Sequence, residues 1–331
     1  MNTPNFASLL QQFFTDRLLG QLGASSHTVA SYRDCFRLLL RFVGDRLRIA
    51  PSELRIEQLD AAFLGEFLEH LETVRRNSIR TRNSRLAALH SFFQYVALSE
   101  PALALHCQRV LGIPAKRYER TPVEFLDEQE IAALLAAADR ETWIGRRDHA
   151  ILLFAIRTGL RNSEITSLRR RDVQLESGSH VRCLGKGRKT RCTPLRPELT
   201  AVLKDWLSEQ SGELDDPLFP SSRGGPLSAD ALQRTVARHV TTASRACPSL
   251  RTKTITPHTL RHTAAMELLQ HGVDLTVIAL WLGHESTETT QAYVHADMRL
   301  KEQALAHASS TGAVPGRYCP SDALLTFLES L

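Results

Sequence analysis

The chain has 331 residues, which favours two folded domains, and its 43% hydrophobic and 23% charged content excludes a disordered or low-complexity protein. The net charge is +5 and the excess lies early, since residues 1–120 carry 16 Lys and Arg against 11 Asp and Glu and the rest is balanced. This basic part is suited to polyanions such as nucleic acid, although an ordinary solvated face would explain the charge equally well.

The first hundred residues are predicted to form a small helical bundle. Apolar residues recur at a spacing near 3.6, which is typical of amphipathic helices. The four predicted helices cover residues 5–22, 26–43, 57–75 and 78–98. The last of them has a stripe predicted to be buried, made of Leu86, Leu89, Phe93 and Val96.

The beginning of that fourth helix is basic. Its first turns hold Arg80, Thr81, Arg82 and Arg85. Arginine side chains near a helix N-terminus, where backbone N–H groups point outward, are suited to DNA phosphate contacts. Solvated surface charge is an equally good interpretation, so these four residues are candidate DNA contacts only.

Residues 101–123 are predicted to be a linker, because they contain three prolines, a glycine and a basic run without periodicity. The second domain then opens at "LDEQEIAALLAAAD", where Asp127 and Glu130 have the spacing of a helix capping box. Further along, "RDHAILLFAIRTG" predicts an apolar helix that ends at Gly159. The predicted fold is therefore mainly α-helical, with an N-terminal bundle and a mixed, mostly helical second domain.

The main interruption in the second domain is "SHVRCLGKGRKTRCTPL". It predicts a β-hairpin with Lys186 in a Gly-Lys-Gly turn, from which a cation can reach into a cleft. Before it, Arg161 stands three residues ahead of Glu164, so the carboxylate can hold the Arg161 guanidinium or a neighbouring group in place.

A further helix is predicted to begin at "TPHTLRHT". Thr256 is a suitable N-cap and Pro257 a suitable first residue. An apolar stripe of Leu260, Ala264 and Leu268 is expected to be buried, so that His258 and Arg261 face a ligand. Two arginines, two histidines and a lysine, together with Tyr293, would suit a pentacoordinate phosphate. The guanidinium groups would bind its oxygens, and an acid would protonate the leaving group.

The sequence "LGHESTETTQAYVH" completes a pattern of six residues in order: Arg161, Lys186, His258, Arg261, His284 and Tyr293. The pattern resembles the tyrosine recombinase (phage integrase) family over most of residues 121–298. The boxes "TGLRNSE", "GKGRKTR" and "PHTLRHT" also match in the expected order. His284 stands where some relatives have tryptophan. The N-terminal bundle is similar to the core-binding domain of the family.

The resemblance implies a site-specific recombinase that cuts and rejoins DNA through a 3′-phosphotyrosyl intermediate and a Holliday junction. Tyr293 would attack the phosphate, and Arg161 and Arg261 would hold its non-bridging oxygens. Three residues have supporting roles: Lys186 would protonate the 5′-oxygen, His258 would assist proton transfer at the tyrosine, and His284 would orient the phosphate. Glu164 corresponds to a supporting carboxylate. Lys189 lies close enough to Lys186 to be a second candidate acid and a DNA contact.

Two other functions share parts of this pattern. A type IB topoisomerase uses the same chemistry, but the short length and the N-terminal bundle favour the recombinase. A catalytically silent DNA-binding relative would be expected to have lost at least one of the six residues. His258 and His262 have a spacing that can bind zinc, but the Glu of the H-E-x-x-H motif is missing, so no metal and no cofactor is expected.

The expected domains are a core-binding domain at residues 1–100, a linker at 101–123, a catalytic domain at 124–298 and a tail at 299–331. The tail ends in a short amphipathic segment with Leu324, Leu325, Phe327 and Leu328. By resemblance it would dock on a neighbouring protomer of a homotetramer on double-stranded DNA, and packing on its own domain is the alternative. Six scattered cysteines and the absence of a long apolar run predict a cytoplasmic protein that does not enter membranes.

Overall fold

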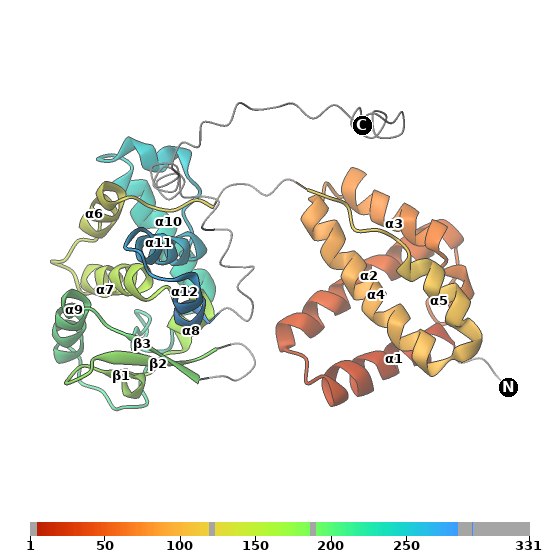
Figure 1. Cartoon of the computed structure of the whole chain (residues 1–331), viewed down its shortest axis with the longest axis horizontal. Coiled ribbons are helices and arrows are strands. Elements are labelled where there is room, and N and C mark those ends of the chain that lie inside the picture. Colours follow the sequence, from red (N-terminus) through yellow and green to blue (C-terminus); the bar gives the residue numbers. More distant parts are fainter. Residues whose placement is uncertain (1–4, 119–122, 186–189, 284–292, 294–331) are drawn as a thin grey trace, which may run out of the picture. The chain divides into compact units, whose positions relative to one another are not determined.

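The computed structural model describes residues 5–118, 123–185, 190–283 and 293, and its chain divides into two units, residues 1–120 and 121–331. Figure 1 shows the helices of the first unit in red to yellow and those of the second in green to blue. No helix of the described residues is long and apolar enough to cross a membrane.

The first unit is a helical bundle, as predicted. Its elements are α1 (Phe6–Gln12), the π-helix η1 (Phe13–Gln21), α2 (Ser26–Leu47), the short helix η2 (Ile56–Gln58), α3 (Ala61–Thr73), α4 (Ile79–Ser99), η3 (Pro101–Leu103) and α5 (Ala104–Leu111). The stripe predicted on α4 lies in the core, where Leu86, Leu89, Phe93 and Val96 are buried. Aromatic rings fill the centre, with the Phe36 and Phe92 centroids 5.2 Å apart in an edge-on arrangement.

Residues 101–111 differ from the predicted linker. They form η3 and α5, and Leu103, Cys107 and Val110 are buried in the core of the first unit. Two of the residues that suggested a linker lie at the ends of these helices: Pro101 occupies the first turn of η3, and Gly112 follows the last residue of α5. Buried residues every three or four positions supply the periodic signal, but the helix is too short for it to be evident from sequence.

The second unit is mostly helical, with one small sheet that Figure 1 shows at its edge. Its helical elements are α6 (Glu128–Ala136), α7 (Trp143–Thr158), α8 (Asn162–Ser167), η4 (Arg170–Asp172), α9 (Pro197–Ser208), α10 (Ala229–Ala243), η6 (Pro248–Thr252), α11 (Pro257–Gln270) and α12 (Leu275–Leu282). The predicted helix starts are confirmed: Asp127 and Glu130 form a reciprocal capping box, and Thr256 caps α11 ahead of Pro257.

The sheet contains β1 (Val173–Gln174), β2 (His180–Leu184) and β3 (Thr190–Pro194) in the order β1-β2-β3. The strands β2 and β3 pair antiparallel, with Val181 opposite Thr193 and Leu184 opposite Thr190. This confirms the two strands of the predicted hairpin. The turn residues 186–189 lie outside the described residues.

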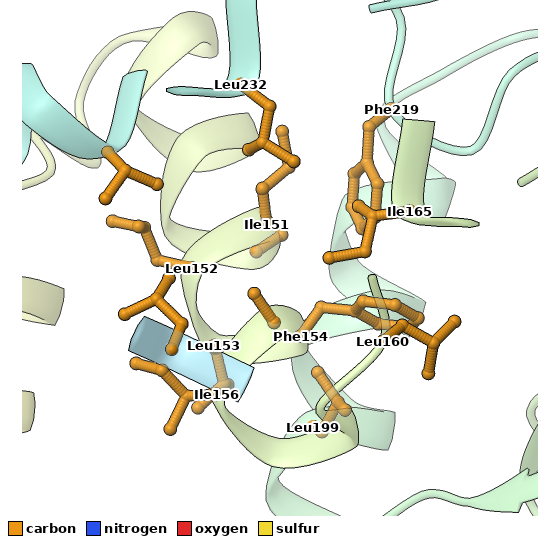
Figure 2. Close-up of a cluster of buried hydrophobic side chains, with 14 of the residues drawn as sticks. Ile151, Leu152, Leu153, Phe154, Ile156, Leu160, Ile165, Leu199, Phe219 and Leu232 are labelled. Atoms are coloured by element: carbon orange, nitrogen blue, oxygen red, sulfur yellow. The ribbon is translucent and has the colours of Figure 1, made fainter. Parts of the chain in front are cut away.

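Helix α7 runs through the core of the second unit. Figure 2 shows its apolar side chains with Leu199, Phe219 and Leu232 around them. Phe154 and Phe219 meet edge to face with centroids 5.5 Å apart. Gly159 ends the helix with φ of 64°, in the left-handed conformation that glycine adopts without strain. Residues 150–156 of α7 are all buried, so the packing around them fixes where the C-terminal carbonyls of the helix lie, and the candidate site is built there.

We expect Gly159→Ala to destabilise the second unit more than Gly178→Ala. Both glycines have positive φ, but a Cβ at Gly159 would lie 2.7 Å from Leu282 Cδ2, whereas a Cβ at Gly178 meets nothing within 4 Å. Both variants should lose about 1 kcal/mol from the backbone, and Gly159→Ala about 1–3 kcal/mol more from overpacking. Urea unfolding measures the difference, and equal losses would contradict the close approach of α12.

Candidate active site

Arg261 is a buried arginine at the point where three helices meet. It projects from α11, its side chain is 2% exposed, and it donates from Nη1 to the Gly159 carbonyl and from Nη2 to the Leu282 carbonyl, both at 2.8 Å. These carbonyls belong to the ends of α7 and α12, where backbone oxygens have no partner within their own helix. The side chain of Arg261 is buried as well as the apolar stripe of α11, because the helix ends supply acceptors in the interior.

The charge of Arg261 is held in a partly desolvated place. Burial, with the nearby charge of Arg161, lowers the pKa of Arg261 to about 10. At neutral pH the group remains protonated. The cation is therefore retained, with little water around it, which strengthens its interaction with an anion.

Arg161 lies beside it, between α7 and α8. Its Nη1 donates to Glu164 Oε1 at 2.9 Å and its Nη2 to the Gly283 carbonyl at 2.8 Å, so the guanidinium is held on two sides. The backbone N–H of Arg161 also donates to Glu164 Oε2 at 2.7 Å. The sequence prediction that Glu164 holds Arg161 is confirmed by these contacts. The side chain of Arg161 remains 32% exposed, which leaves room for a ligand.

A third arginine, Arg191 of β3, shares the same carboxylate. Its two terminal nitrogens donate to the two oxygens of Glu164 at 2.9 and 2.7 Å. Burial opposes the charge of Glu164, but the hydrogen bonds from Arg191 and from the Arg161 backbone outweigh it and lower the pKa of Glu164. Arg191 is the last residue of the box "GKGRKTR", but sequence spacing does not predict its contact with Glu164, because the two residues are 27 positions apart.

Tyr293 is described in the last predicted box, together with Leu282 and Gly283 at its start. Its side chain is 2% exposed, and its hydroxyl lies 2.9 Å from His262 Nδ1. Burial raises the pKa of Tyr293 to about 12, while the charges of Arg261 and Arg161 act in the opposite direction. The charges of Arg161 and Arg261 therefore lie close enough to Tyr293 to affect the pKa of its hydroxyl, as the sequence pattern requires.

His262 is the second residue that the sequence analysis did not assign to the reaction. It follows Arg261 directly, and it was considered only as a zinc partner of His258. His258 is exposed on the first turn of α11, and its ring centroid lies 4.2 Å from that of His262. No group of three potential metal ligands was found among the described residues. The sequence placed both histidines on one helix face but could not tell which one meets the tyrosine.

Three residues predicted for the site, Lys186, Lys189 and His284, lie outside the described residues. Of the six residues in the pattern, the structure therefore describes Arg161, His258, Arg261 and Tyr293.

The candidate DNA contacts at the start of α4 have unequal surroundings. Arg80 is exposed, and Thr81 is partly buried beside the N-cap Ser78. Arg82 is 6% exposed and donates to the Pro114 carbonyl at 3.0 Å, so it is a buried structural residue rather than a surface contact. Arg85 is partly buried and donates to the Ser31 carbonyl at 2.7 Å. Periodicity could not reveal the burial of Arg82, because its partner comes from the segment that follows α5.

Two family descriptions match the chain. "Phage integrase family" covers residues 124–299, more than half of the chain, and "Phage integrase, N-terminal SAM-like domain" covers residues 10–99. The chain belongs to the phage integrase family. It is a tyrosine recombinase, an enzyme of site-specific DNA recombination, and its two units contain the two regions matched by these descriptions.

Similar proteins extend the match to almost the whole recombinase. "Putative integrase/recombinase y4rC" of Sinorhizobium fredii is 52% identical and covers 99% of this chain and 98% of its own. "Tyrosine recombinase XerC" of Pelobacter propionicus is 35% identical over 84% of this chain and 88% of its own. The fold is similar to that of XerH recombinase bound to its difH substrate, with a TM-score of 0.63 and 24% identity over 92% of this chain and 84% of that one.

The raised pKa of Tyr293 makes the stability of the recombinase depend on pH in a predictable direction. The phenol ionises near pH 10 in an unfolded chain and near 12 in the folded one, so its contribution is present below about pH 10 and is lost as the pH rises to about 12. The difference in unfolding free energy between the unsubstituted protein and Tyr293→Phe should fall by about 2 kcal/mol over that interval. Urea unfolding at a series of pH values tests this, and parallel pH curves would contradict it.

Proposed function

We propose that this recombinase cleaves and rejoins DNA with Tyr293 as the nucleophile. The tyrosine oxygen would attack a backbone phosphorus, the bond to the 5′-oxygen would break, and a 3′-phosphotyrosyl intermediate would form. Attack by the released or exchanged 5′-hydroxyl would reverse the step and restore the phenol. The observation that carries the proposal is the geometry of three separate parts of the chain: Arg261 and Arg161 donate to the adjacent carbonyls of Leu282 and Gly283, and the Tyr293 hydroxyl is hydrogen-bonded to the residue that follows Arg261.

The two arginines are suited to the phosphate of the transition state. Arg261 is fixed by two carbonyls, and Arg161 by Glu164 and the Gly283 carbonyl. A guanidinium has five N–H donors, so each arginine keeps donors beyond those used in these contacts. Donors that are already oriented stabilise developing negative charge without reorganising during the reaction.

Proton transfer at Tyr293 would start with His262. The hydrogen bond between His262 Nδ1 and the phenol supports His262 as the first acceptor of the proton, with the ring of His258 packed against it. Lys186 would protonate the departing 5′-oxygen and His284 would orient the phosphate, as the family resemblance implies. Because the phenol is 2% exposed, DNA binding has to make it accessible before the attack.

The first unit would be the core-binding domain. Its match to the SAM-like N-terminal description and its positive charge support this role. Arg80 would meet DNA phosphates at the start of α4, with Thr81 and Arg85 near it. The proposed core-binding domain extends through α5 to residue 111. A connection up to residue 123, the catalytic region 124–298 and the tail 299–331 follow it. The DNA substrate also supports the expected cytoplasmic location.

The central test is a covalent-capture experiment on DNA from the flanks of the gene for this protein. A nicked duplex carrying the mapped cleavage site should accumulate a protein–DNA adduct with the unsubstituted recombinase and none with Tyr293→Phe. The phenyl ring keeps the packing but lacks the attacking oxygen, so binding should change by less than about threefold, since only one hydrogen bond is lost. A persistent adduct with Tyr293→Phe would reject this nucleophile.

The active assembly would be a homotetramer on DNA. The apolar residues of the tail support docking of one protomer on the next, and they lie outside the described residues. Deleting residues 319–331 should lower the fraction of tetramer on DNA, measured by analytical ultracentrifugation, while cleavage of a nicked substrate by bound monomers continues. An unchanged tetramer fraction would argue against this role of the tail.

A further inference from the structure

We infer that Arg191 is a positioning residue of the recombination site, which neutralises Glu164 so that Arg161 keeps its positive charge for the DNA phosphate. The inference rests on the proposed role of Arg161. It concerns a strand residue that belongs to none of the six positions in the sequence pattern.

The first observation is the hydrogen bonding of Glu164. Its carboxylate accepts two bonds from Arg161, through the backbone N–H and Nη1, and two from the guanidinium of Arg191. The pairing with Arg191 is of the bidentate form, the strongest geometry for an arginine and a carboxylate. The Glu164 side chain is 5% exposed and that of Arg191 is 13% exposed, so water screens the pair only weakly.

The second observation is the balance of charge. A pair of Arg161 with Glu164 alone would have no net charge, and the carboxylate would compete with a phosphate for the arginine. With Arg191 present, one carboxylate faces two guanidinium groups, and Arg261 adds a third cation nearby. Burial opposes ionisation of Arg191, but its hydrogen bonds with Glu164 prevail and raise the pKa of Arg191. The site therefore keeps a net positive charge for an anionic ligand.

The third observation is the fit between Arg191 and Gly283. A Cβ at Gly283 would lie 2.7 Å from Nη1 of Arg191, so only glycine lets the guanidinium reach Glu164 here. The carbonyl of Gly283 in turn accepts from Arg161. Arg191 thus binds Glu164 and lies next to the residue whose carbonyl accepts from Arg161. The Nε of Arg191 is buried without a hydrogen-bond partner among the described residues. The arginine side chain therefore satisfies the Glu164 carboxylate while one of its own donors stays unpaired.

The test compares Arg191→Met with the double variant Arg191→Met, Glu164→Gln. Methionine removes the charge and leaves Glu164 to neutralise Arg161, so single-turnover cleavage of the nicked duplex should fall by about 100-fold, as for loss of an oriented charge in a transition state. Glutamine then removes the competing negative charge, and cleavage should recover at least about tenfold relative to Arg191→Met. A purely structural role predicts that the second substitution adds damage.

The matched control is Arg146→Met, which removes a guanidinium from a partly exposed pair with Glu209 and from two backbone carbonyls in the same unit. It should cleave within about twofold of the unsubstituted protein, since exposed ion pairs contribute little. Unchanged cleavage in Arg191→Met, or no recovery in the double variant, would overturn the inference. If Arg191→Met does not fold, Arg191→Lys replaces it: the lysine keeps the charge, so cleavage should stay within about tenfold, and a complete loss would overturn the inference.

The Tyr293→Phe control separates this inference from the proposed function. An adduct with Tyr293→Phe, or no adduct with the unsubstituted protein, would remove the proposed nucleophile. An adduct with the unsubstituted protein and none with Tyr293→Phe would leave the proposed nucleophile in place. Full activity of Arg191→Met would then contradict only the role of Arg191.

Discussion

The buried guanidinium of Arg261 is the constraint around which the second unit is arranged. A cation in the interior is costly unless its donors are matched, and here the matching acceptors are the carbonyls of Gly159 and Leu282 at the ends of α7 and α12. The close approach of Leu282 to Gly159 follows from this meeting point. One side chain of α11 therefore holds two helix ends and also places a positive charge where the tyrosine lies.

The same principle operates at Arg161, where Glu164 and the Gly283 carbonyl provide the acceptors. The two arginines use carbonyls of adjacent residues, Leu282 and Gly283, so the end of α12 is part of the site as well as of the fold. The packing of the helix ends therefore determines the positions of the charged groups in the site. A change that moved α12 would alter both guanidinium groups at once.

The sequence predicted local features well, because local chemistry determines them. Caps such as Asp127 and Thr256 satisfy backbone groups of their own helices, and the alternation in residues 180–194 gives the hairpin. Predictions that needed a distant partner were less successful. Arg82 is buried and donates to the Pro114 carbonyl, which lies 32 residues later in the chain. Residues 101–111 form helices that pack on the core of the first unit, and the sequence near them does not indicate this packing.

The sequence by itself determined which residue types are available for the chemistry and in what order, and this was sufficient to indicate the family. Only the tertiary structure decided that His262 forms a hydrogen bond with Tyr293, that Arg261 is buried, and that Arg191 pairs with Glu164. The reason is physical. Helical spacing restricts His258 and His262 to one face, but the hydrogen bond is made with a segment 31 residues away, and such a contact depends on how the helices pack.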